Sequence, residues 1–334
     1  MDNTKISDSE LGYRFHVQFH ITNHCNLNCK HCYEGGIPRL DQWQIDEFKE
    51  AIDKLWGAFA KWGLIGEISL IGGEPTMHPK FYDMVDYLYS RGDVDAISIL
   101  TNGTRIDNMF IDLVKRNHCY VQISMDGIDA EHHDFIRGAH NFEHVISSLS
   151  ILREHGISPS VHYVLSKYTT PLNEKFFDFL IEQKIHQISF SRLVPFGNAK
   201  VNEMLTKQEL KETMSFIDEM KRKYKNNELN VASTRPLWCH FGYSGRCPVG
   251  IQTITILENG DIMPCRRLPI VIGNIKKDSF YKVWYTNPVL NDLRNRNKIE
   301  ECGQCNKLHI CGGARCIAYA FYGDYMKKDP QCWI

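Results

Sequence analysis

The chain has 334 residues, with 39 basic and 40 acidic side chains and a formal net charge of −1 at pH 7. This balance argues against binding to nucleic acid and against a polybasic membrane arm, and no apolar run is long enough to cross a bilayer. The polar first ten residues lack the apolar centre of a secretory signal. We therefore expect a cytoplasmic protein of one large or two modest domains that needs no disulfide bonds to fold.

The first predicted strand, 15–21, leads directly into three closely spaced cysteines. Cys25, Cys29 and Cys32 form a C-x3-C-x2-C run, and the chain has twelve cysteines in all. In a reducing compartment such cysteines bind metal more often than they form disulfides. Thiolates held this close favour an iron–sulfur cluster or a soft metal. Three ligands instead of four suggest a cluster with one open iron.

From residue 15 to about 227, strand-like runs alternate with amphipathic helices. The predicted strands are 15–21, 67–71, 96–100, 120–125, 160–165 and 186–191; the predicted helices are 45–59 (capped by Asp41), 81–88, 110–114, 142–152, 176–181 and 210–220. Thr206 and Glu209 form a capping-box signature before the last helix. Six β/α units predict a parallel α/β sheet with right-handed crossovers, either open or curled into a barrel.

Small and polar residues follow the second, third and fourth predicted strands. They are Gly72-Gly73-Glu74, Asn102 and the pair Ser124 and Asp126. Because the loops at the carboxyl ends of parallel strands meet at one edge, we expect these residues to lie beside the three cysteines.

The alternation stops near residue 228, and the rest of the chain is rich in cysteine. Segments 253–256 and 262–264, joined through Asn259-Gly260, predict a small hairpin. We divide the chain into an N-terminal extension (1–14), an α/β domain (15–227) and a cysteine-organised domain (228–334). Cys119 stands apart and is predicted to be a small buried residue.

The three cysteines and the motifs after the strands resemble those of the radical S-adenosylmethionine (SAM) enzymes, over roughly residues 14–227. The resemblance implies a partial (β/α)6 TIM barrel. It also implies a 4Fe–4S cluster on Cys25, Cys29 and Cys32 whose open iron binds SAM, and reductive cleavage of SAM to a 5′-deoxyadenosyl radical. The alternative is zinc held by the three cysteines, with His24 or His31 as a possible fourth ligand.

The same resemblance implies roles for individual residues around SAM. Glu74 would accept from the SAM ammonium, with Gly72 and Gly73 allowing close approach, and Ser124 and Asp126 would contact the ribose. Three further residues each allow two interpretations. His31 lies against adenine or only shields the cluster, and Arg137 pairs with the SAM carboxylate or is a solvated residue at a helix end. Asn102 belongs to the site or only forms a turn. Leu193 would offer backbone contacts to adenine.

The C-terminal cysteines resemble the SPASM domain, which carries two auxiliary 4Fe–4S clusters, over roughly residues 239–334. The spacing from Cys311 to Cys316 is one residue longer than usual in that domain. Carried over, Cys239, Cys247, Cys265 and Cys316 would hold one cluster and Cys302, Cys305, Cys311 and Cys332 the other, for three clusters in the chain. The alternative is one or two structural zinc sites.

The resemblance implies hydrogen abstraction from a ribosomally made peptide or protein, forming a thioether or carbon–carbon cross-link. Alternatives are a tetrapyrrole or other cofactor-pathway enzyme, a sulfatase-maturating (formylglycine) enzyme, and an iron–sulfur electron-transfer or scaffold protein with a vestigial SAM site. Arg266 stands where the sulfatase-maturating branch has an acidic residue. Arg266 and Arg267 either bind substrate carboxylates or are surface charges. Expected partners are the substrate, a flavodoxin- or ferredoxin-type reductant and, given the short N-terminus, a separate leader-binding protein.

Overall fold

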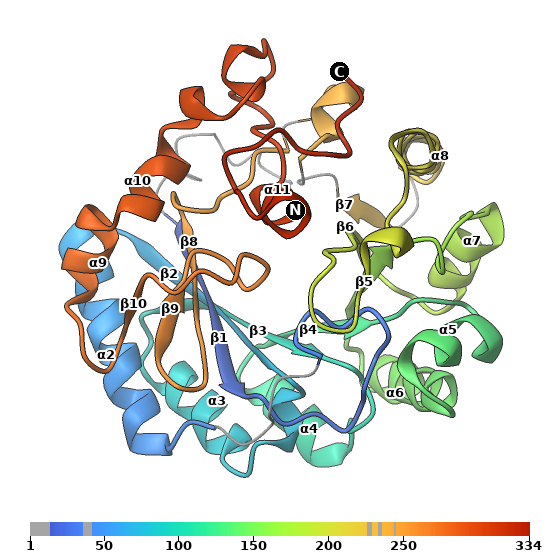
Figure 1. Cartoon of the computed structure of the whole chain (residues 1–334). Helices are drawn as coiled ribbons and strands as arrows, with labels where there is room; N and C mark the ends of the chain where they lie inside the picture. The colour runs from blue at the N-terminus through green and yellow to red at the C-terminus, as the bar shows by residue number, and fades with distance from the viewer. Residues whose placement is uncertain (1–13, 36–41, 226–228, 233–235, 244) are drawn as a thin grey trace.

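One mixed sheet of ten strands forms the centre of the protein (Figure 1). The computed structural model describes residues 14–35, 42–225, 229–232, 236–243 and 245–334. The strands are β1 (Arg14–Thr22), β2 (Ile65–Gly72), β3 (Val94–Thr101), β4 (Tyr120–Ser124), β5 (Ser160–Leu165), β6 (Gln187–Arg192), β7 (Asn230–Ala232), β8 (Thr253–Ile256), β9 (Asp261–Met263) and β10 (Gly273–Asn274). They lie in the order β10-β9-β8-β1-β2-β3-β4-β5-β6-β7. Strands β1 to β7 are parallel, as the alternating pattern predicts.

Helices between the parallel strands cover the outside of the curved sheet (Figure 1). They are α2 (Ile45–Trp62), α3 (Phe81–Ser90), α4 (Asn108–Arg116), α5 (Ala130–Arg137), α6 (Asn141–Glu154), α7 (Glu174–Glu182) and α8 (Lys207–Lys223). The six predicted helices are confirmed, and α5 is an addition. Helix α2 begins after Gln44, whereas Asp41, its predicted cap, lies outside the described residues.

Local sequence signals account for how these helices begin and pack. The capping box before α8 is confirmed: Thr206 N donates to Glu209 Oε2 at 2.7 Å, and Glu209 N donates to Thr206 Oγ1 at 3.2 Å. On α2, Phe48 and Ile52 are fully buried, and the Phe48 ring meets the Phe19 ring of β1 edge-on at 5.0 Å. An apolar stripe at helical spacing therefore anchors α2 on the sheet.

The C-terminal region does not form a sheet of its own. The predicted hairpin is present as β8 and β9, but β8 also pairs in parallel with β1, and β7 extends the sheet beyond β6. The sheet thus continues beyond the six strands of the predicted partial barrel, through β7 on one side and the hairpin on the other. The physical reason is that β1 would otherwise be an open edge, and the fully buried strand β8 supplies its missing partner. The division into domains at residue 228 stays a prediction.

After β10 the chain crosses the open side of the sheet, between β8 and β7 (Figure 1). This segment contains α9 (Phe280–Thr286), α10 (Pro288–Arg294) and α11 (Arg315–Tyr322). Arg192 at the end of β6 holds it through Asp329, with Nη1 to Oδ1 at 3.0 Å and Nη2 to Oδ2 at 2.7 Å. Within the described part of the chain, no helix is long and apolar enough to span a membrane.

Candidate active site and auxiliary cysteine groups

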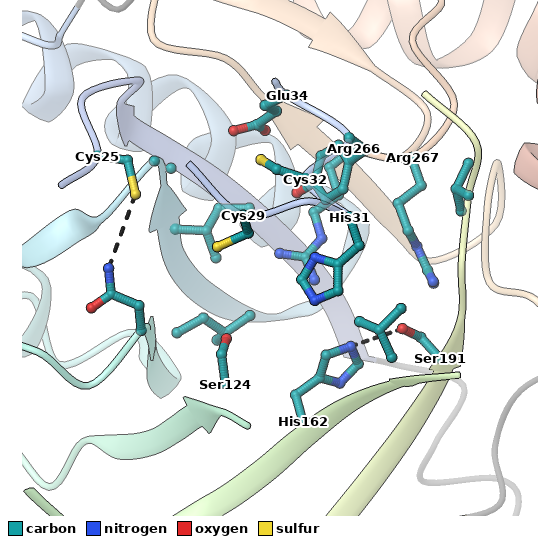
Figure 2. A pocket seen from close by; sticks show the side chains of 18 of the residues that line it. Cys25, Cys29, His31, Cys32, Glu34, Ser124, His162, Ser191, Arg266 and Arg267 are labelled. Carbon is teal, nitrogen blue, oxygen red and sulfur yellow. Dashed lines mark hydrogen bonds between the residues drawn. The ribbon is translucent and has the colours of Figure 1, made fainter. Parts of the chain in front are cut away.

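A cavity of about 290 Å³ lies at the carboxyl ends of strands β1 to β6 (Figure 2). We call it the main cavity. Segments distant in sequence meet here because parallel strands end at one edge of the sheet. Twelve of the predicted site residues line it: Cys25, Cys29, His31, Cys32, Gly72, Gly73, Asn102, Ser124, Arg137, Leu193, Arg266 and Arg267.

The three cysteines of the loop after β1 all line the main cavity, with Cys29 and Cys32 near each other and Cys25 farther along the loop (Figure 2). The Leu27 N–H donates to Cys25 Sγ at 3.4 Å, and Asn102 Nδ2 lies 4.0 Å from the same sulfur. Burial raises the pKa of the Cys32 thiol to about 11. Cluster thiolates commonly accept N–H groups of this kind, so this loop fits a cluster held by three cysteines.

Two glycines allow the turn after β2 to approach the cysteine loop. A Cβ on Gly72 would lie 2.1 Å from the Thr22 carbonyl oxygen, and one on Gly73 would lie 2.2 Å from that of His24. Backbone hydrogen bonds join the two segments, from Gly73 N to Thr22 O at 2.9 Å and from Glu74 N to His24 O at 2.7 Å. The two loops can therefore pack this closely only because residues 72 and 73 are glycines, apart from the predicted role of these glycines in letting SAM approach.

Glu74 lies behind the wall of the main cavity and is 1% exposed. Its Oε1 accepts from Thr101 Oγ1 at 2.8 Å and its Oε2 from Asn102 N at 2.7 Å. Burial raises the pKa of this carboxyl, while the donors around it act in the opposite direction. Glu74 therefore ties the turn after β2 to the end of β3. Its contact with the SAM ammonium stays a prediction.

Asp126 is fully buried and connects two residues of the cavity wall. Its Oδ2 lies 2.7 Å from His31 Nε2 and accepts from Arg137 Nε at 2.7 Å, and its Oδ1 accepts from Val164 N at 3.1 Å. Burial alone would raise the pKa of Asp126, but the Arg137 guanidinium and the His31 ring lower it. Asp126 thus orients His31 and Arg137, whereas Ser124 faces the cavity. The ribose contact of Asp126 and the SAM-carboxylate contact of Arg137 stay predictions.

Sequence reasoning missed a row of polar side chains that lies next to Ser124 on β4, β5 and β6 and faces the main cavity. Gln122, His162, Ser191 and Arg192 all line it. The His162 ring lies 2.9 Å from Ser189 Oγ through Nδ1 and 2.9 Å from Ser191 Oγ through Nε2 (Figure 2). The period of two along a strand places alternate residues on one face, and this signal was available in the sequence.

Arg266 and Arg267 follow β9 and line the main cavity, with Arg266 beside Cys32 and His31 of the cysteine loop (Figure 2). The Arg266 guanidinium lies 5.8 Å from the centre of the Tyr33 ring. Burial alone would lower the pKa of Arg267, but the neighbouring thiols, Cys316 foremost, raise it above its usual value. Both side chains are half-buried and line the main cavity, and their contact with substrate carboxylates stays a prediction.

The C-terminal cysteines form two groups, and one of them departs from the prediction. Cys247, Cys265 and Cys316 line a cavity of about 50 Å³, and we call them the three-cysteine group. Cys239 was assigned to this set but lines the other cavity, together with Cys311. The five-cysteine group lines a cavity of about 30 Å³ and consists of Cys239, Cys302, Cys305, Cys311 and Cys332.

Buried donors without a partner surround the C-terminal cysteines. Arg315 Nε and Nη2 and Arg296 Nη1 are buried and have no hydrogen-bond acceptor within the described part of the chain. Arg296 Nη1 lies beside Gly312 and Arg315 Nη2 beside Gly313, the two residues that follow Cys311. The sulfides of a cluster would accept such N–H groups.

The five-cysteine group therefore fits a cluster, but the division into five and three does not fit two sets of four ligands. Among the described residues, no three His, Cys, Asp or Glu side chains are arranged around a single metal ion.

Two family models match this chain. The radical SAM superfamily matches residues 19–180, and an iron–sulfur cluster-binding domain, SPASM, matches residues 247–306. The AdoMet-dependent heme synthase of Methanosarcina barkeri is 25% identical, over 95% of this chain and 95% of the relative. The antilisterial bacteriocin subtilosin biosynthesis protein AlbA of Bacillus subtilis is 27% identical, over 93% of this chain and 69% of the relative.

The fold is similar to that of a solved protein that binds S-adenosylmethionine. The crystal structure of Streptococcus suis SuiB bound to S-adenosylmethionine matches with a TM-score of 0.77 at 19% identity, over 97% of this chain and 78% of that one. Together the two domains imply SAM and 4Fe–4S clusters as cofactors. The chain is an enzyme, and it belongs to the radical SAM enzymes that carry a C-terminal SPASM domain.

Proposed function

We propose that this enzyme removes a hydrogen atom from an unactivated carbon of a substrate that carries carboxylate groups. The observation behind this proposal is the pair Arg266 and Arg267, which line the same main cavity as Cys25, Cys29 and Cys32 (Figure 2). Arg192 lines the same cavity. Guanidinium groups are well suited to bind carboxylates through paired hydrogen bonds.

SAM bound at the cluster of the cysteine loop supplies a 5′-deoxyadenosyl radical, after one electron from a flavodoxin- or ferredoxin-type donor. The residues of the chain position the reactants and exclude water. Asp126 holds His31 and Arg137 in the wall, while Glu74 holds the loop that carries Asn102. Ser124 and His162 face the space between this wall and the arginines, where the substrate carbon would lie.

A tetrapyrrole is our first candidate for the substrate. An AdoMet-dependent heme synthase matches this chain along nearly the whole length of both proteins, and porphyrins carry the carboxylates that the arginines would bind. A ribosomally made peptide, cross-linked through a thioether or carbon–carbon bond, is the second candidate. The similarity to the bacteriocin biosynthesis protein AlbA supports it. This order reverses the one that the sequence alone suggested.

Anaerobic incubation of the reconstituted enzyme with SAM and dithionite tests the radical chemistry. We expect 5′-deoxyadenosine, formed faster when iron coproporphyrin III is added. No 5′-deoxyadenosine under any condition would overturn the proposal. To separate the two substrates, a small-molecule extract is added to the enzyme before and after protease treatment. If the substrate is a peptide, the treatment should abolish the stimulation of 5′-deoxyadenosine formation. If the substrate is a porphyrin, the stimulation should remain.

The arginine wall is tested with the double variant Arg266→Gln/Arg267→Gln. We expect KM for a carboxylate-bearing substrate to rise at least about tenfold, since each charged hydrogen bond contributes about 1.5–3 kcal/mol. Arg105→Gln, at a position outside the lining of the main cavity, is the matched control. An unchanged KM in the double variant would contradict carboxylate recognition by these residues.

A further inference from the structure

The connection between β6 and α8 reaches from the main cavity to the cysteine loop after β1. Leu193, Val194 and Phe196 line the main cavity. Asn198, two residues further on, is hydrogen-bonded to the backbone of the cysteine loop. One short segment therefore contacts both the cavity and the loop that is expected to hold the SAM cluster.

Asn198 makes three hydrogen bonds to the cysteine loop. Its backbone N–H donates to the Cys32 carbonyl oxygen at 2.9 Å, and its Nδ2 donates to the Cys29 carbonyl oxygen at 2.9 Å and to Asn28 Oδ1 at 3.0 Å. Both partners of Nδ2 are acceptors, so these contacts determine which end of the side-chain amide faces the loop.

Cys29 and Cys32 lie at the two ends of one turn. The Cys32 N–H donates to the Cys29 carbonyl oxygen at 3.2 Å, and the Lys30 N–H between them donates to the Ile136 carbonyl oxygen of α5 at 2.9 Å. Asn198 thus holds the carbonyl groups at both ends of a closed turn. Because the turn sets the separation and direction of the two thiols, its conformation decides whether both can bind one cluster.

The connection and the cysteine loop approach too closely for a Cβ on either side of their contact. Gly197 has a φ of +63°, and a Cβ there would lie 2.5 Å from the Cys32 carbonyl oxygen. A Cβ on Gly35 of the cysteine loop would lie 2.2 Å from Asn198 Cγ. The two glycines therefore allow the Asn198 side chain to lie directly against the loop.

Apolar contacts hold the connection from its other side. Its buried residues form a small cluster with residues at the start of α11, separate from the main core: Leu193, Val194, Ala199, Met204, Ala314 and Ile317. The Leu193 N–H also donates to the Leu165 carbonyl oxygen of β5 at 3.0 Å. Asn198 therefore contacts the cysteine loop from a fixed support, as a hydrogen bond that orients its acceptor requires.

We infer that Asn198 is a positioning residue for the SAM cluster, because it holds the turn from Cys29 to Cys32 in the conformation in which both thiolates bind. The inference requires the 4Fe–4S cluster that the family implies, but no particular substrate. Hydrogen bonds around the residues that carry metal ligands fix these ligands in place, and their loss typically lowers metal affinity about 10–100-fold. The loop should therefore release iron more readily when the Asn198 side chain cannot donate.

The first test measures how fast a chelator removes iron from the reconstituted full-length protein without oxygen. The iron of the SAM cluster is the part that is missing when Cys25, Cys29 and Cys32 are all replaced by alanine, about four per chain. In Asn198→Asp, which has nearly the same shape but no Nδ2 donor, we expect this part to be lost at least about tenfold faster. Asn202→Asp makes the same substitution at an exposed position four residues further on and is the matched control.

Asn198→Ala distinguishes the lost donor from the added charge, because alanine removes the donor without adding a charge. We expect the same faster loss of iron in this variant. In both variants the component of the electron paramagnetic resonance (EPR) spectrum that responds to SAM should also change, whereas it should stay unchanged in Asn202→Asp. An effect confined to Asn198→Asp would overturn the inference, since the added charge alone would then explain it.

The outcomes separate this inference from the proposed function. If replacing Cys25, Cys29 and Cys32 by alanine removes no iron, the SAM cluster is absent, and the inference and the proposed radical chemistry both fail. If the replacement removes iron but both Asn198 variants release that iron at the rate of the control, only the inference fails.

Discussion

The two cysteine-bearing regions of this enzyme are built in different ways. Cys25, Cys29 and Cys32 come from one short loop after β1, and their neighbours come from the ends of adjacent parallel strands. The C-terminal cysteines come from separate segments spread over residues 239–332, among them the 3-10 helix η3 (Trp238–Phe241) with Cys239 and α11 with Cys316. The first site is therefore positioned by one loop and the sheet, whereas the C-terminal groups depend on contacts between segments far apart in the chain. The predictions below test this difference.

Removing one cysteine should separate the regions most sharply. We expect Cys29→Ala to lower 5′-deoxyadenosine formation to the background level, because the open iron that binds SAM is lost. Cys305→Ala should retain SAM cleavage and lower the iron content by up to about four per chain. Anaerobic product analysis and iron determination measure both effects. If Cys305→Ala also abolished SAM cleavage, the two regions would not be independent.

A substitution of Asp126 tests whether its buried ion pair with Arg137 stabilises the wall of the first site. Asp126→Asn should lower the free energy of unfolding by about 3 kcal/mol, because the Arg137 guanidinium would stay buried without its counter-charge. Anaerobic denaturant titration, followed by circular dichroism, measures the loss. Glu143→Gln is the control, since that side chain is 78% exposed. A loss in Asp126→Asn no larger than in the control would show that the pair does not support the wall.

Arg192 tests the link between the regions. Arg192→Lys keeps the charge but loses the paired hydrogen bonds to Asp329, so we expect a loss of about 2 kcal/mol. The effect should concentrate in the C-terminal segment, visible as faster amide hydrogen exchange there than in β1 to β4. Uniform exchange across the chain would mean that this link does not hold the segment separately.

We expect the smallest loss of stability from a substitution at Thr206, the N-cap residue of α8, which is remote from both cysteine-bearing regions. Thr206→Ala should destabilise the protein by about 1 kcal/mol, because the Glu209 N–H loses its side-chain acceptor. SAM cleavage and iron content should be unchanged. Thr206→Ser retains the hydroxyl and should behave as the unsubstituted protein in thermal unfolding.

The sequence predicted the first site well because its signals are local. A strand followed by C-x3-C-x2-C, and short motifs at the ends of β2 to β4, place residues at one edge of a parallel sheet whatever the details of packing. What the motifs could not show is the orientation of single side chains. Asp126 and Ser124 lie two residues apart, yet Asp126 turns toward Arg137 and His31 while Ser124 faces the cavity.

By itself the sequence determined the alternation of strands and helices, the loop that carries Cys25, Cys29 and Cys32, and the family resemblance. The periodicity of apolar residues and the spacing of ligands are properties of short segments, so they can be read without the fold. Only the tertiary structure decided that β8 completes the sheet beside β1 and that Cys239 lies with Cys311. Both depend on contacts between residues far apart in the chain, which no local pattern encodes.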